Sequence, residues 1–218
     1  MAEMELGQGV TALQSRAKNA EYAIFAVIAV TALILLTEIL ELFGIVEYAG
    51  LQPPDTLSEI ATLILVAFIP ISLISVVTVC MWVYRAHDNL RAANFELEHT
   101  PGWAVGWYFI PLANLIKPFQ VMKEQWNTTF FQDDRYTSEA PSIITVWWAS
   151  YIVSNILGNV AARLQEASNY TGSGNTTGIL LNLGSSVLWI VSAWCLLTLI
   201  RQITAGHRDG LLLADTFT

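Results

Sequence analysis

The chain contains four long runs of apolar residues, separated by polar segments. Each run holds more than about 20 residues, which is enough for a helix to cross the ~30 Å hydrocarbon layer of a bilayer. The pattern predicts an all-α integral membrane helical bundle with four transmembrane helices, at residues 22–46, 57–84, 142–164 and 179–203. They form a single transmembrane domain over residues 22–203, flanked by an N-terminal segment (1–21) and a polar tail (204–218). Residues 51–55 include two consecutive prolines and are expected to break the chain between the first two helices.

A fifth apolar segment, residues 101–119, does not fit this pattern. It is marginal in length for a straight span, and Pro111 and Pro118 interrupt it, together with the polar Asn114. We therefore expect a Pro-broken re-entrant or interfacial hairpin that packs on the bundle, with a fifth span as the alternative. Trp103 and Trp107 are four residues apart, so they should share one helix face.

The composition agrees with a membrane protein and argues against one class of partner. Hydrophobic residues make up 54% of the 218 residues and charged residues only 13%, against the about 25% charged residues of soluble domains. The net charge of −8 excludes nucleic acid as an expected partner, because phosphate binding needs a basic surface.

The basic residues predict how the helices are oriented. With four spans, nine of the ten Lys and Arg residues fall on one side: Arg16, Lys18, Arg85, Arg91, Lys117, Lys123, Arg135, Arg201 and Arg208. By the positive-inside rule we expect a multi-pass protein of the cell membrane with both termini in the cytoplasm. A fifth span would move Lys123 and Arg135 to the outside. With four spans, an aromatic belt is expected at the cytoplasmic interface: Trp82, Tyr84, Trp126, Trp147 and Trp148.

Two carboxylates in the first apolar run are candidates for a functional or structural role. Glu38 and Glu41 are three residues apart on one helix face, and carboxylates inside a membrane usually face a partner, a cavity or a proton path. Arg163 lies at about the same depth on the third predicted span. The hypothesis is an ion pair between Arg163 and one of the glutamates, which acts as a structural clamp rather than as part of an ion pathway.

The third predicted span carries two stripes at four-residue spacing. Polar positions include Asn155 and Asn159, and a neighbouring stripe of small residues contains Ser154, Gly158 and Ala162. Small residues let helices approach closely, and asparagine side chains can form hydrogen bonds across the contact. The pattern indicates a packing helix, with the fourth span as a neighbour. Besides membrane lipids, the expected partners are other membrane subunits or a second copy held through the small-residue face.

Enzymatic chemistry finds little support. All aspartates lie outside the predicted spans, and the patterns for zinc hydrolases, phosphate loops and nucleophile elbows are absent. The three histidines, His87, His99 and His207, lack metal-ligand spacing and are expected to be ordinary surface residues. We therefore predict no catalytic, cofactor or metal site. A lipid-modifying enzyme is a distant alternative, for which the candidate residues would be Arg85, Asn89, Arg91 and Glu124.

Two sequence clusters are familiar in combination. The first is Trp82-x-Tyr84-Arg85-Ala86-x-x-Asn89-Leu90, and the second runs from Pro101-x-Trp103 through Pro111-x-x-Asn114 and Pro118 to Trp126. Together they resemble a prokaryotic multi-span membrane-protein family known only as domain of unknown function 4328. The resemblance implies a multi-span membrane domain and carries no reaction, substrate or cofactor.

The residues of the two clusters suggest physical roles. Arg85 is expected to reach the cytoplasmic headgroups, while the prolines break the apolar segment and Asn114 serves the backbone groups freed there. The expected function is a non-enzymatic scaffold, accessory subunit or interaction module. The alternative is a small transporter or channel that uses Glu38 and the Asn155/Asn159 stripe.

Overall fold

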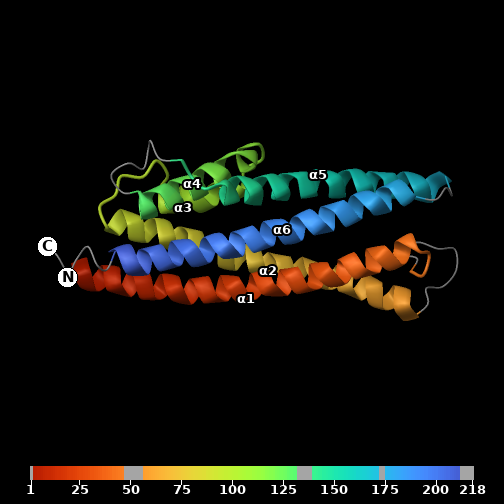
Figure 1. Ribbon diagram of the computed structural model, residues 1–218, viewed down its shortest axis with the longest axis horizontal. Helices are drawn as coiled ribbons and strands as arrows, with labels where there is room; N and C mark the ends of the chain where they lie inside the picture. The colour runs from red at the N-terminus through yellow and green to blue at the C-terminus, as the bar shows by residue number, and fades with distance from the viewer. Residues whose placement is uncertain (1, 47–55, 132–138, 172–174, 212–218) are drawn as a thin grey trace. The chain divides into compact units, whose positions relative to one another are not determined.

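The computed structural model describes residues 2–46, 56–131, 139–171 and 175–211 and is helical throughout its regular elements (Figure 1). The α-helices are α1 (Ala2–Leu42), α2 (Thr56–Ala92), α3 (Pro101–Gly106), α4 (Lys117–Phe130), α5 (Ser142–Thr171) and α6 (Thr176–Gly206). Two 3₁₀ turns, η1 (Trp107–Phe109) and η2 (Ala113–Leu115), separate α3 from α4, and a π-helical turn, η3 (His207–Leu211), follows α6. The predicted break at residues 51–55, Arg135 and the end of the predicted tail lie outside the described residues.

Four helices are long and apolar enough to cross a membrane, as the sequence predicted: Leu6–Leu42, Thr56–Ala92, Ser142–Ser168 and Thr176–Gly210. Each is longer than the apolar run that predicted it, because the helix continues into the flanking polar sequence. The largest extension is in α1, which begins at Ala2 rather than near Tyr22. Its added part buries a stripe with helical spacing, Leu6, Val10, Leu13, Ala17 and Ala20.

The chain divides into two compact units, and each of the four long helices contributes a segment to both. The first unit contains residues 1–23, 74–146 and 195–218, and the second contains residues 24–73 and 147–194. Hydrogen bonds between helices occur inside each unit. In the second unit, Ser154 of α5 donates to the Ser185 carbonyl of α6 at 3.0 Å, and Ser192 of α6 donates to the Trp147 carbonyl of α5 at 3.1 Å.

Residues 101–130 of the first unit form a hairpin in which α3 and α4 contact each other and run in opposite directions (Figure 1). Local sequence explains where α3 begins, because Thr100 accepts a hydrogen bond from the Trp103 backbone N–H and Pro101 occupies the first turn. Trp103 and Trp107 lie together as predicted, with ring centroids 4.7 Å apart. Residues 101–119 are thus divided into short pieces and do not form the single helix that a fifth span requires.

The two prolines of this segment act differently. Pro118 lies in the first turn of α4, where its missing N–H removes no helical hydrogen bond, and its side chain is buried. Pro111 lies in the exposed turn between η1 and η2. Asn114 takes part in that turn through its backbone, since its N–H donates to the Ile110 carbonyl at 2.9 Å.

Candidate functional site

The carboxylate of Glu124 joins three separate segments of the first unit. One oxygen, Oε2, lies 3.3 Å from Nε2 of His87 on α2 and 3.0 Å from Nδ1 of His99, which lies just before α3. The other oxygen, Oε1, accepts the backbone N–H of Glu98. Because an ionised carboxylate can only accept hydrogen bonds, both imidazole nitrogens must donate. We call these three side chains, Glu124, His87 and His99, the Glu124 latch.

The latch is buried, and its hydrogen bonds control the charge of Glu124. The two imidazoles are almost fully inaccessible, and 15% of the Glu124 side chain is exposed. Burial by itself would raise the pKa of the Glu124 carboxyl. The hydrogen bonds from His87, His99 and the Glu98 backbone outweigh burial and lower this pKa below its ordinary value. The carboxylate therefore remains ionised where it fastens the hairpin to α2.

Two further hydrogen bonds hold α4 in place beside the latch. Gln125 is fully buried and donates to the Val83 carbonyl of α2 at 3.2 Å. Thr129 lies 3.2 Å from Nε2 of His207, which follows α6. A side chain at Gly206 would collide with Thr129 and Phe130, so a glycine is required for α4 to approach the end of α6 this closely. The polar face of α4 is thus bonded to both α2 and the end of α6.

All three histidines are buried, which contradicts the expectation of surface positions. His87 and His207 have no exposed surface, and His99 is 5% exposed. Each one lies in a polar stretch of the sequence but is covered in the folded chain. No group of three or more His, Cys, Asp or Glu side chains among the described residues could hold a metal ion. In this structure the latch is held together by hydrogen bonds.

A hollow of about 340 Å³ opens beside the latch. Its lining is mostly polar and includes Glu96, Glu98, Gln120, Lys123, Glu124 and Thr128. It holds no cysteine or serine that could act as a nucleophile. The residues considered for a lipid enzyme do not gather here either, because Arg85 contacts Gly9 and Asp88 whereas Glu124 contacts the two histidines.

The first sequence cluster proves to be a packing surface of α2. Trp82 is fully buried, and its indole N–H donates to the Thr204 hydroxyl of α6 at 3.0 Å. Arg85 donates to the Gly9 carbonyl of α1 at 3.3 Å and to Asp88 at 2.7 Å. A Cβ at Gly9 would collide with the side chains of Arg85 and the buried Asn89. In the structure Arg85 contacts α1 and its own helix, and its expected position at the headgroups stays a prediction.

The predicted aromatic belt is only partly exposed. Trp82, Trp147 and Trp148 are buried at 0%, 4% and 8% exposure, and Trp126 is half-buried. Tyr84 alone of the five is exposed, at 43%. Tryptophan is common at membrane interfaces and in helix contacts alike, so residue type could not separate the two roles.

The polar groups of the second unit do not form the predicted ion pair. Glu38 is 7% exposed and accepts a hydrogen bond from the Ser186 hydroxyl of α6 at 3.0 Å. Arg163 is exposed, and within the described part of the chain no ion pair joins it to Glu38 or Glu41. The prediction of an Arg163 clamp was wrong. The partner of Glu38 is the Ser186 hydroxyl of α6 and not Arg163.

The two stripes of α5 differ in what they contact. Asn155 and Asn159 donate to backbone carbonyls one turn earlier on their own helix, both at 2.7 Å. Ser154 contacts Ser185 of α6, and a Cβ at Gly158 would lie 3.2 Å from the Ser185 hydroxyl. Ser154 and Gly158 therefore bring α5 and α6 together within the chain, as predicted for a packing helix, whereas Ala162 is exposed.

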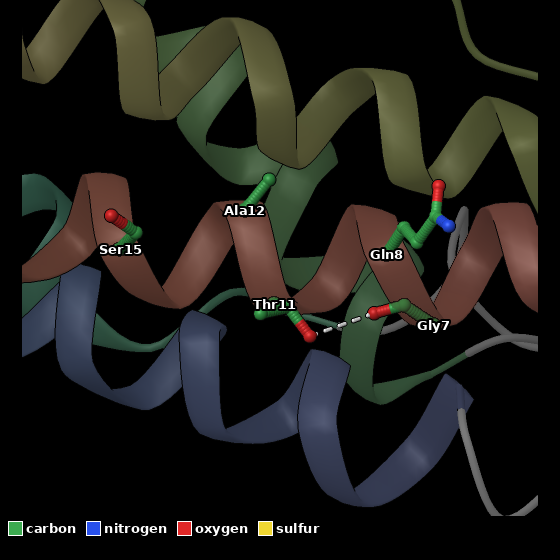
Figure 2. Close-up of a pocket in the computed structure, with 5 residues that line it drawn as sticks. All are labelled: Gly7, Gln8, Thr11, Ala12 and Ser15. Atoms are coloured by element: carbon green, nitrogen blue, oxygen red, sulfur yellow. Dashed lines mark hydrogen bonds between the residues drawn. The ribbon is translucent and has the colours of Figure 1, made fainter.

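A second hollow, of about 600 Å³, lies along the first turns of α1. Figure 2 shows its five lining residues, Gly7, Gln8, Thr11, Ala12 and Ser15, on successive turns of this helix. The Thr11 hydroxyl donates to the Gly7 carbonyl at 3.0 Å. The hollow is wide and open, its lining contains no titratable group, and it offers no catalytic chemistry.

Comparison with known families gives one match. The family described as "Domain of unknown function (DUF4328)" matches residues 46–205. The match includes α2, the hairpin with the Glu124 latch, α5 and nearly all of α6. No curated protein and no solved structure matches the chain. The chain belongs to the DUF4328 family, as the two sequence clusters indicated.

Proposed function

We propose that the protein is a non-enzymatic membrane protein, an accessory or scaffold subunit that a partner helix contacts along α2. The supporting observation is the exposure of this helix. Only 6% of the most apolar 18-residue stretch of α2 is buried, against 28–39% for the other three spanning helices. Leu63, Val66 and Leu73 are among its exposed side chains, each more than half exposed.

Buried polar side chains in both units form hydrogen bonds within the chain, and this supports a structural role. Glu38, Ser154 and Ser192 form hydrogen bonds within the second unit. Trp82 and Glu124 do so within the first unit. Such bonds between helices are typical of a protein that holds a fixed arrangement in the membrane. A transport path would need some of these groups to face a continuous wet cavity.

Photo-crosslinking in native membranes tests this proposal. A crosslinking amino acid would replace Leu63 or Leu73 on α2, and Ile156, an exposed residue of α5, would be the matched control. We expect a discrete protein adduct from the α2 positions and none from Ile156. Its mass distinguishes a second copy from another subunit. Adducts with lipid alone at all three positions would contradict the proposal.

Glu38 favours a second candidate, a small proton or cation transporter. Its Oε1 accepts from Ser186, whereas its buried Oε2 has no hydrogen-bond partner among the described residues. The weakness of this candidate is that Asn155 and Asn159 donate to their own helix. Flux into proteoliposomes that is abolished by Glu38→Gln and retained by Glu41→Gln would favour it. Absence of proton, sodium and potassium flux in the unaltered protein would exclude it for these ions.

A further inference from the structure

We propose that the tip of the hairpin, residues 108–116, inserts into the acyl-chain region of the lipid bilayer. The tip contains no charged residue. Its large apolar side chains are exposed, with Leu112 at 80%, Phe109 at 67% and Ile116 at 59%. An exposed cluster of this kind marks a surface that another apolar phase covers.

The backbone at the apex supports a function for the exposed leucine. Leu112 has φ +66° and ψ −47°, and the Ala113 N–H donates to the Pro111 carbonyl at 2.9 Å. These values define a γ-turn with positive φ, which is rare and strained for a residue with a side chain. The strained backbone holds the most exposed large side chain of the hairpin at its apex. In water this arrangement would combine strain with unfavourable exposure, whereas transfer of the Leu112 side chain to hydrocarbon would remove that exposure, and the free energy gained would offset the cost of the strain.

The order of residues along the hairpin indicates lipid as the occupant rather than protein. Trp107 directly precedes the apolar tip and lies against Trp103, and Lys117 directly follows the tip. Lys117 lies 5.6 Å from the Trp107 ring centroid and 3.8 Å from Glu98. An apolar tip bounded by tryptophan and charged groups matches the change of environment from the core of a bilayer to its surface. Four helices of the chain are long and apolar enough to cross a membrane, so the tip would need no further partner to reach lipid.

Fluorescence quenching in nanodiscs tests the insertion directly. A single cysteine replaces Leu112 in the full-length protein, in a Cys80→Ala, Cys195→Ala background, and carries the polarity-sensitive dye NBD. The discs hold one protein each and contain phosphatidylcholine with a nitroxide on the acyl chain, and aqueous iodide is used in parallel. Phe109→Cys provides a second tip position, and Glu96→Cys, exposed at the base, is the matched control.

We expect the acyl nitroxide to quench the dye at Leu112 and Phe109 several-fold more than at Glu96, and iodide to show the reverse order. Equal iodide quenching at tip and base would mean that the tip lies in water and would overturn the proposal. Protection from both quenchers at the tip would also overturn it, because the tip would then be covered by protein.

Discussion

Replacing Glu124 with glutamine should loosen the hairpin without unfolding the membrane helices. The substitution keeps the size of the side chain but leaves one acceptor oxygen where the carboxylate offers two. Both imidazole N–H groups point at the same oxygen, Oε2. If the amide nitrogen takes this position, Nε2 of His87 can accept from it only when the imidazole proton moves to Nδ1. This nitrogen is buried and has no partner in the part of the chain that the structure describes. A buried donor is therefore left unsatisfied in either tautomer.

An unsatisfied buried donor costs about 1–3 kcal/mol. Taking about 2 kcal/mol, and one tenfold change per ~1.4 kcal/mol, local opening of the hairpin should become roughly 30-fold more frequent. Hydrogen–deuterium exchange measured by mass spectrometry on the protein in nanodiscs reports this opening peptide by peptide. We expect faster exchange in peptides from residues 93–130 and little change in α5 and α6.

Glu98→Gln is the matched control, because it removes one negative charge from a residue that contacts Glu124 through its backbone N–H. The Glu98 side chain is 73% exposed and lies 3.8 Å from Lys117, and an ion pair of this kind contributes about 0–1 kcal/mol. Its backbone N–H, which contacts Glu124, is unchanged. Equal exchange in the two variants would refute the role of the latch.

Three further predictions concern pH and helix packing. The pKa of Glu124 is lower in the folded protein than its ordinary 4.5, so the stabilisation that the ionised carboxylate gives is complete above pH 4.5 and is lost as the pH falls through the pKa of the folded state. In that pH range hydrogen exchange in the hairpin should rise in the unaltered protein and should not rise in Glu124→Gln. Trp82→Phe should lower the free energy of unfolding in detergent by about 0.5–1.5 kcal/mol for the hydrogen bond, plus any packing loss, and a double-mutant cycle with Thr204→Val should show coupling. Gly158→Leu should lower the thermal midpoint, because the new side chain meets Ser185, whereas Val160→Leu on the exposed face should not.

The four spanning helices were predictable because the signal is long and repeated. A run of more than 20 apolar residues has few structural alternatives. The break in residues 101–119 was also predictable, since Pro111 and Pro118 prevent a straight helix. The early start of α1 could have been found from the stripe formed by Leu6, Val10 and Leu13, which the long apolar run after it obscures.

The contacts between helices were not predictable to the same degree. The choice of Ser186 rather than Arg163 as the partner of Glu38 depends on how α1, α5 and α6 are rotated, and the sequence does not contain that information. The burial of His87 and His99 depends on the hairpin, whose residues are distant in sequence from α2. The close approach at Gly9 gave a weak signal, because a glycine inside a helix is often a contact point.

The orientation of the hairpin is the most direct test of this account. Single cysteines at Thr100, Gln120 and Thr177, in the Cys80→Ala, Cys195→Ala background, would be treated with a membrane-impermeant maleimide in intact cells. The account predicts labelling at Thr177 alone, because the topology predicted from the basic residues places both ends of the hairpin on the cytoplasmic side and the start of α6 outside. Labelling at Gln120, with none at Thr100 or Thr177, would mean that residues 101–119 cross the membrane and would contradict the account.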